Sequence, residues 1–405
     1  MSESKNNIVS GAVFVCALIM VLISLVSVIF PALILSNYGS IQNNIEPFEL
    51  GNNAALLIII NVILFSLGYL YYKRHSKAFS NIIDRIRRYD VSKRVAVIAS
   101  IVILAIYIGL TIPELYLDED EQFPDYEILV NSLQVFPSTD TGNVFYDEQN
   151  SRYVRMLLLG ASQDYLQNVK VVPFLASILL VVFTGLTTIA ISHKRTAGIL
   201  AMIILLQGYT FLEYDTIAVY EKIWVLFFLL SIYAINRRWY LSGFWYVLSV
   251  FTKAFSTPFL AMNIFYALRS DESKSYKVKI LLSYLVAAIV ILSLFAFGNS
   301  IYDDFINIDF NRFANSLSDL SSQLRFDYFL LFTLLPITVG LYFLGRNGVK
   351  HADSLLFLIF GLILAGPLVS LVTDFYVILP YRFVPLLVFF SVAVGLLVFK
   401  NPKFS

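Results

Sequence analysis

Long apolar runs alternate with short polar connections along the whole chain. A run of about 20 apolar residues is long enough to cross a bilayer as one helix. The pattern therefore predicts an all-α polytopic membrane protein with about 12 transmembrane helices. The seventh and eighth runs are short and nearly adjacent, which predicts either two half-spans or one bent unit. The expected spans are 9–36, 53–72, 95–113, 171–192, 197–212, 217–235, 240–252, 254–268, 279–298, 328–345, 355–373 and 383–399.

Composition agrees with a membrane location. The 405 residues are 58% hydrophobic and 14% charged, whereas soluble domains carry about 25% charged residues. The single cysteine, Cys16, lies in the first run and cannot form an internal disulfide. No small-residue cleavage site follows that run, so we expect a retained helix rather than a signal peptide.

Basic residues gather in alternate loops. Of the 29 Lys and Arg residues, 21 lie at Lys5 or in 72–94, 193–195, 236–238, 269–279, 346–350 and 400–403. Cytoplasmic loops carry the excess of Lys and Arg. The distribution predicts a multi-pass protein of the cell membrane or endoplasmic reticulum, with both termini cytoplasmic. It leaves two substantial loops outside, 114–170 and 299–327.

The first outer loop combines an acidic head with two amphipathic segments. The run "YLDEDEQFPDYE" (116–127) carries six carboxylates in ten residues. Apolar positions within 126–136 and 151–167 suit two helices lying at the membrane interface. An ordinary solvated loop is the simpler alternative.

Carboxylates just above a bilayer have two chemical uses. One can act as a general base toward a hydroxyl, and a group of them can bind a divalent cation. Solvated loop charge is the more common explanation of a lone acidic run. All three His residues (His75, His193 and His351) fall in predicted cytoplasmic loops. An outer base must therefore be Asp, Glu or Tyr.

Eight cations lie in the expected outer loops or spans. Lys253 interrupts two apolar runs, and Arg382 lies at the outer end of the last run. Ionisable groups near hydrocarbon are costly and face a partner or a wet cavity. That partner is a carboxylate or a lipid phosphate, while a side chain reaching the headgroups at a span end is the alternative. Lys222 is expected to pair with Glu221 or Asp215. The remaining five are Arg152, Arg155, Lys170, Arg312 and Arg325.

Four stretches, in order, resemble the GT-C superfamily of integral membrane glycosyltransferases, especially its protein-mannosyltransferase-like branch. They are "YLDEDEQFPDYEILVNSL", "NVKVVPFLASILLVVFTGLTTIAISHKR", "WVLFFLLSIYAINRRWYLSGFWYVLSVFTKAFSTPFLAMNIFYALR" and "LPYRFVPLLVFFSVAVGLL". The resemblance covers about 95–400. It divides the chain into an N-terminal two-span hairpin with its basic loop (1–94) and a GT-C-like core (95–405).

The resemblance implies transfer of a sugar from a polyprenyl-phosphate donor to an acceptor hydroxyl on the outer face, with inversion. The base would be one of Asp118, Glu119, Asp120 and Glu121, and we favour Asp120. Lys253 and Arg382 would hold the lipid phosphate, together with Arg152 and Arg155. The residues identify no particular cofactor, although the acidic outer loop could hold a divalent cation, and no nucleic-acid partner is expected.

Departures from the family pattern leave other functions open. Pro173 replaces a common Arg, and the outer-face His residues of some relatives and a "WWD"-like segment are absent. A catalytically inactive relative fits these gaps, as does a non-catalytic scaffold of the same fold that binds a partner protein. A lipid or solute transporter is a further alternative, which predicts internal repeats and broken helices at mid-membrane.

Overall fold

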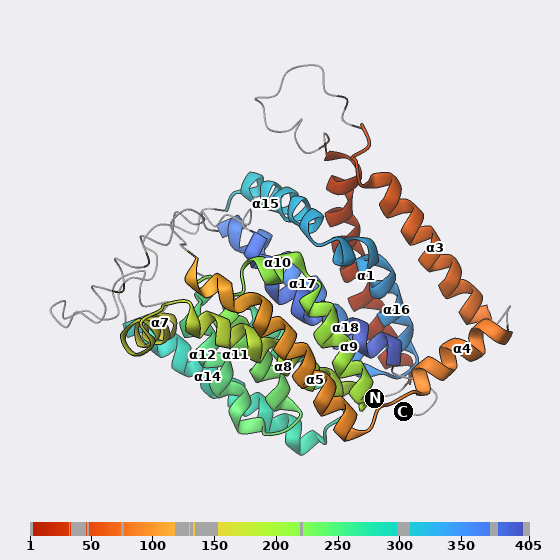
Figure 1. Cartoon of the computed structure of the whole chain (residues 1–405). Coiled ribbons are helices and arrows are strands. Elements are labelled where there is room, and N and C mark those ends of the chain that lie inside the picture. The colour runs from red at the N-terminus through yellow and green to blue at the C-terminus, as the bar shows by residue number, and fades with distance from the viewer. Residues whose placement is uncertain are drawn as a thin grey trace.

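The computed structural model is helical throughout the residues that it describes (Figure 1). These are residues 3–31, 33, 46, 48–73, 77–117, 129, 133, 153–218, 222–297, 308–372 and 380–399. The helices in the first half are α1 (Glu3–Ile29), α3 (Ala54–Lys73), α4 (Lys77–Arg88), α5 (Lys93–Thr111), α7 (Tyr153–Leu166), α8 (Val171–Ser192), α9 (Arg195–Leu206) and α10 (Tyr209–Glu213). Those in the second half are α11 (Lys222–Ile235), α12 (Trp239–Thr252), α13 (Leu260–Arg269), α14 (Lys274–Phe297), α15 (Phe310–Gln323), α16 (Tyr328–Arg346), α17 (Lys350–Val372) and α18 (Val384–Phe399). Short 3-10 helices cover Ile112–Tyr116 (η1), Ala254–Phe259 (η3), Leu324–Phe326 (η4) and Pro380–Phe383 (η5).

Eight of these helices are long and apolar enough to cross a membrane: α1, α3, α5, α8, α14, α16, α17 and α18. The multi-pass prediction is therefore confirmed, but the number of twelve spans is not. Helices occupy the other four expected runs too, yet α9, α11, α12 and α13 have only 12, 14, 14 and 10 residues. At 1.5 Å per residue each is shorter than the roughly 30 Å of hydrocarbon.

Two of the short helices continue across a break. The chain leaves α9 at Gln207 and re-enters a helix at Tyr209, where α10 begins. Beyond α12, the 3-10 helix η3 leads directly into α13. The expected runs 240–252 and 254–268 thus form two short helices that turn back at Lys253. Arg237, before α12, and Asp271, after α13, line the same pocket, so the pair is not a single bent span.

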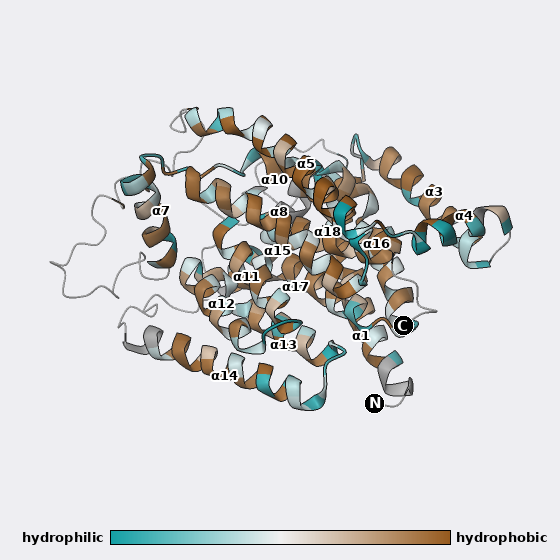
Figure 2. Ribbon diagram, turned by 60° about the horizontal axis from the view of Figure 1, so that its bottom comes forward, coloured by the Kyte–Doolittle hydropathy of each residue, from teal (hydrophilic) through white to brown (hydrophobic). Residues whose placement is uncertain are grey.

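Helix α18 lies at the centre of the bundle, and α3 and α5 lie at its edge. Within the described residues, 83% of the apolar window of the last span is buried, against 17% for those of α3 and α5. Apolar side chains of the edge helices point away from the bundle and are exposed, as a lipid-facing surface requires. Figure 2 shows the same distribution, with hydrophobic residues along the helices and hydrophilic residues gathered on α4 and the connections.

The connections collect at two opposite ends of the bundle. At one end, which we call the basic end, a pocket of about 390 Å³ is lined by residues of several predicted cytoplasmic loops, among them His193, Arg195, Arg237, Asp271 and His351. Helix α1 begins and α18 ends toward this end in Figure 1. A buried ion pair between Arg269 and Asp353 ties α13 to α17 there.

The other end, which we call the acidic-loop end, is where η1 leads into the acidic run. Figure 1 shows α7 there, seen nearly end-on beside the long helices, and α15, which packs against α1 and α17. The segment 151–167 contains a helix, α7, as expected, and 299–327 contains α15; their position at the membrane interface stays a prediction. Of the other expected amphipathic segment, 126–136, only Leu129 and Leu133 are among the described residues. The described basic loops lie at one end of the bundle and the start of the acidic loop lies at the other, which agrees with the alternation of loop charge along the sequence. The membrane side that each end faces stays a prediction.

Candidate functional site at the acidic-loop end

The bend after α12 fixes the position of Lys253. Its backbone is extended (φ −156°, ψ 116°), which ends the helix, while its amide still donates to the Ser249 carbonyl at 3.0 Å. Its own carbonyl accepts from the Ser256 amide at 3.0 Å, which begins η3. The Tyr246 hydroxyl donates to the Thr257 carbonyl at 2.6 Å and closes the bend against α12. Lys253 therefore lies at a defined helix break rather than within a continuous span.

Lys253 and Arg382 converge on one buried tyrosine. The Nζ atom of Lys253 lies 5.8 Å from the centroid of the Tyr381 ring. The guanidinium carbon of Arg382 lies 5.9 Å from the same centroid, and Tyr381 is 1% exposed. Tyr214 packs edge-on against that ring with centroids 5.6 Å apart. Two cations that are 129 positions apart in sequence thus share one aromatic platform.

A buried lysine lies among carboxylates beside this platform. Lys222 is 1% exposed, its Nζ donates to the Phe211 carbonyl at 2.7 Å, and it lies 3.6 Å from the centroid of the Phe211 ring. Its charge favours the ionised forms of both Asp215 and Asp327. Glu221, the alternative partner predicted from sequence, lies outside the described residues. Asp215 is therefore the predicted neighbour that the structure shows, and Asp327 is an additional one.

Hydrogen bonds hold the two carboxylates. Asp327 accepts from the Thr210 amide at 3.2 Å and also from the Thr210 hydroxyl. Asp215 accepts from the Thr111 hydroxyl at 3.3 Å, at the end of α5. Burial raises the pKa of Asp215 to about 6, although Lys222 and the hydroxyl donors oppose that shift. Burial likewise raises the pKa of Asp327, against the bonds from Thr210. These carboxylates join the ends of α5, α10 and α16.

A set of polar contacts fixes the point where the acidic run begins. The Nζ atom of Lys170, just before α8, donates to the Leu117 carbonyl at 2.5 Å and to the Glu114 carbonyl at 3.2 Å. The Asn168 amide donates to the Leu115 carbonyl at 2.9 Å. We call this the 117 clasp, and it is formed by Glu114, Leu115, Leu117, Asn168 and Lys170. Asp118 is the next residue after Leu117, so the acidic run starts from a fixed backbone position.

The predicted site residues divide into those that the structure brings together and those that it does not describe. Lys253 and Arg382 both lie about 6 Å from the Tyr381 ring, and their role toward a phosphate stays a prediction. Arg155 is 7% exposed on α7, a helix that packs against both α8 and α12. Asp118, Glu119, Asp120, Glu121 and Arg152 lie outside the described residues, so the predicted base stays a prediction.

Sequence reasoning missed Tyr214, Tyr381 and Asp327. Tyr381 is adjacent to Arg382, and aromatic neighbours of a membrane cation were the only available signal. Asp327 is the last residue of the predicted outer loop 299–327, directly before α16. No pattern in the neighbouring sequence predicts its contact with Thr210. Among the described residues, no group of three or more His, Cys, Asp or Glu side chains is placed to hold a metal ion.

Comparisons of the chain with protein-family models, curated proteins and solved structures find no match.

Proposed function

We propose that this chain is a membrane glycosyltransferase that moves a sugar from a polyprenyl-phosphate donor to an acceptor hydroxyl, with inversion at the anomeric carbon. The observation that supports it best is the convergence of Lys253 and Arg382 on the buried Tyr381 ring. This pair lies at the end of the bundle where the acidic run begins. A lipid phosphate and an acidic base are thus both expected at one end.

The proposed chemistry needs one carboxylate and a held phosphate. The carboxylate, Asp120 in our assignment, takes the proton of the acceptor hydroxyl. The acceptor oxygen forms a bond to the anomeric carbon from the face opposite the phosphate. The bond between that carbon and the phosphate oxygen breaks, and the polyprenyl phosphate leaves with the electron pair. Arg382 can bind phosphate oxygens through two parallel hydrogen bonds, and Lys253 adds a point charge.

Burial increases what these two cations can contribute. Charges interact more strongly where water is excluded; Lys253 and Arg382 are half-buried beside the fully buried Tyr381. The 117 clasp supports the arrangement from the other side, because it sets the origin of the acidic run relative to α8.

Donor binding and sugar transfer test separate parts of the proposal. The purified full chain would be given radiolabelled polyprenyl-phosphate hexoses, and bound and transferred label would be measured. Lys253→Ala and Arg382→Ala should each weaken donor binding, while Arg346→Ala, an exposed cation at the basic end, should not. Equal donor binding in all three variants would remove Lys253 and Arg382 from the site.

The base is tested by isosteric variants of the acidic run. Asp120→Asn should lower transfer by on the order of 10²- to 10⁴-fold, the usual contribution of a general base, with donor binding unchanged. Asp118→Asn, Glu119→Gln and Glu121→Gln are the matched controls. Undiminished transfer in Asp120→Asn, with loss in one of the controls, would move the role to that residue. Donor binding without transfer in the native chain would instead fit the non-catalytic scaffold.

A lipid or solute transporter is the second candidate, because the structure shows helix breaks that such proteins use. The chain is interrupted between α9 and α10 and again at Lys253, and the latter break carries a charge. Discontinuous helices at binding sites are typical of transporters. Proteoliposomes distinguish the two, since a transporter moves labelled lipid-linked sugar between leaflets with no acceptor present.

A further inference from the structure

Helix α4 lies in the connection between two candidate membrane spans. It follows α3, which ends at Lys73, and precedes α5, which begins at Lys93. Figure 1 shows it turned away from the direction of α3 and running back toward the bundle near the termini. Since both neighbouring helices are expected to cross the bilayer, α4 must lie near the membrane surface at the basic end.

The exposed side of α4 carries two adjacent stripes. One is apolar and contains Ala78, Ile82 and Ile86, and it continues into Tyr89, the residue that follows the helix; Ile82, Ile86 and Tyr89 are 59%, 48% and 60% exposed. The spacing of four, four and three residues places these side chains on one face of a helix.

The second stripe is basic and consists of Lys77, Arg85 and Arg88, all exposed. Asp84, the only acid of α4, does not join it, because its carboxylate accepts from the Tyr71 hydroxyl of α3 at 2.8 Å. The outward charge of the helix is therefore entirely positive.

The opposite side of α4 is fixed to the bundle. Arg87 donates to the Leu397 carbonyl of α18 at 2.9 Å and to the Tyr71 hydroxyl at 3.1 Å. Ser80 is buried on the same side. These contacts prevent α4 from rotating its exposed stripes inward.

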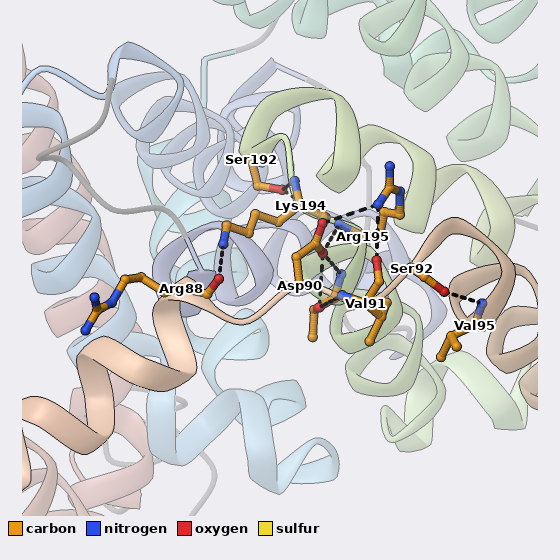
Figure 3. A network of polar contacts seen from close by, with 9 residues as sticks. Arg88, Asp90, Val91, Ser92, Val95, Ser192, Lys194 and Arg195 are labelled. Atoms are coloured by element: carbon orange, nitrogen blue, oxygen red, sulfur yellow. Dashed lines mark hydrogen bonds and ion pairs between the residues drawn. The ribbon is translucent and has the colours of Figure 1, made fainter.

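The segment that follows α4 is anchored as well (Figure 3). Lys194 Nζ donates to the Arg88 carbonyl at 2.8 Å. The Asp90 carboxylate accepts from the backbone amides of Arg195 and Thr196 at 2.8 and 3.1 Å. Burial tends to raise the pKa of Asp90, but these hydrogen bonds and the Arg195 charge outweigh it and lower the pKa. The turn between α8 and α9 therefore holds the end of α4 in place.

We propose that α4 is a built-in binding surface for anionic lipid headgroups of the leaflet at the basic end. Its apolar stripe would enter the boundary between headgroups and acyl chains, and Lys77, Arg85 and Arg88 would contact lipid phosphates. An amphipathic helix with a basic polar face binds an anionic membrane surface in this way. The occupant is lipid because the flanking spans already hold the helix at the bilayer, and the charge of the face selects anionic headgroups.

The first test measures lipid preference. The full chain in detergent would be mixed with phosphatidylglycerol or phosphatidylcholine, and bound lipids would be counted by native mass spectrometry. The triple variant Lys77→Gln, Arg85→Gln, Arg88→Gln should lose preference for phosphatidylglycerol by on the order of 10- to 100-fold, since each cation near an anionic surface strengthens binding roughly fivefold.

The matched control has three exposed cations removed elsewhere at the basic end. The variant Arg238→Gln, Lys274→Gln, Arg346→Gln changes net charge equally and should keep most of the preference. An unchanged preference in the α4 variant, or an equal loss in the control, would overturn the proposal.

The second test measures depth and leaves the charges of α4 intact. In a Cys16→Ser background, a cysteine at Ile82→Cys would carry an environment-sensitive nitrobenzoxadiazole label, with Asn347→Cys in the α16–α17 connection as the exposed control. In nanodiscs containing phosphatidylglycerol, the label at 82 should emit at shorter wavelength and be quenched by doxyl-labelled lipid several-fold more than the label at 347. Equal quenching at both positions would show that the apolar stripe faces water or a protein partner, and the proposal would fail.

Discussion

The buried ion pair between Arg269 and Asp353 gives a stability prediction with a large expected effect. The Arg269 side chain is 7% exposed and that of Asp353 is fully buried. Asp353 also accepts from the Ser10 hydroxyl at 2.8 Å, so its carboxylate links α1, α13 and α17. Replacing it with Ala leaves a buried guanidinium without its counter-charge. Breaking a buried pair in this way costs about 3–5 kcal/mol in the free energy of unfolding.

An exposed pair at the same end is the matched control. Lys350 and Asp271 lie 2.8 Å apart, but their side chains are 42% and 69% exposed. Asp271→Ala should therefore cost about 0–1 kcal/mol, as exposed pairs do. The two variants remove the same functional group from the same end of the bundle and differ mainly in burial.

Equilibrium unfolding in mixed micelles with a rising fraction of dodecyl sulfate, followed by tryptophan fluorescence, measures both variants. The double variant Arg269→Met, Asp353→Leu should recover most of the stability lost in Asp353→Ala, because it removes both buried charges. Similar losses in Asp353→Ala and Asp271→Ala would refute the argument. A double variant less stable than Asp353→Ala would show that the cost of Asp353→Ala does not come from the unpaired buried charge of Arg269.

Three further predictions concern single side chains. Burial raises the folded-state pKa of Asp215 from an ordinary 3.8 to about 6. The folded state therefore binds this proton more tightly than the unfolded state does. The resulting stabilisation is fully present below about pH 4 and is lost as the pH rises through about 6. Asp215→Asn should therefore flatten the pH dependence of unfolding across that window and stabilise the protein at pH 7; an unchanged profile would contradict the shift. A Cβ at Gly243 would lie 2.4 Å from the Ser283 carbonyl oxygen, whereas Gly109 has nothing within 4 Å. Gly243→Ala should thus cost about 1–3 kcal/mol by separating α12 from α14, and a thermal midpoint equal to that of Gly109→Ala would refute this. Tyr381→Leu should weaken the proposed donor binding by roughly 2- to 30-fold, as expected for loss of a cation–π contact, with Tyr381→Phe near native; equal binding in both variants would remove the ring from the site.

The long spans and the grouping of loops were predictable because they depend on local composition. A run of 20 apolar residues predicts a helix regardless of what the helix packs against. A cluster of basic residues predicts a loop at one end of the bundle regardless of how the helices are arranged. The bend at Lys253 was also visible, since a charge between two short apolar runs is hard to place in one continuous span. The count of twelve spans is not confirmed, because α9, α11, α12 and α13 have the composition of spans without their length.

The contacts of the candidate site were less predictable because they join distant segments. Lys253 and Arg382 were identified one at a time from the cost of a charge near hydrocarbon. Their shared ring, Tyr381, depends on where the turn after α12 lies relative to η5, which no local pattern encodes. Asp327 is the clearest case, since its partner Thr210 is 117 positions away and belongs to a helix of five residues.

The short helices and the buried charges have one physical explanation. A continuous helix satisfies its own backbone groups and can remain in hydrocarbon, whereas a broken helix leaves carbonyls and amides that need partners. Such partners are present at the breaks of this chain. Lys222 donates a hydrogen bond to the Phe211 carbonyl of α10, and Asp327 accepts one from the Thr210 amide of the same helix. Charges and helix breaks therefore stabilise one another at the acidic-loop end. The proposed phosphate site lies at this same end of the bundle.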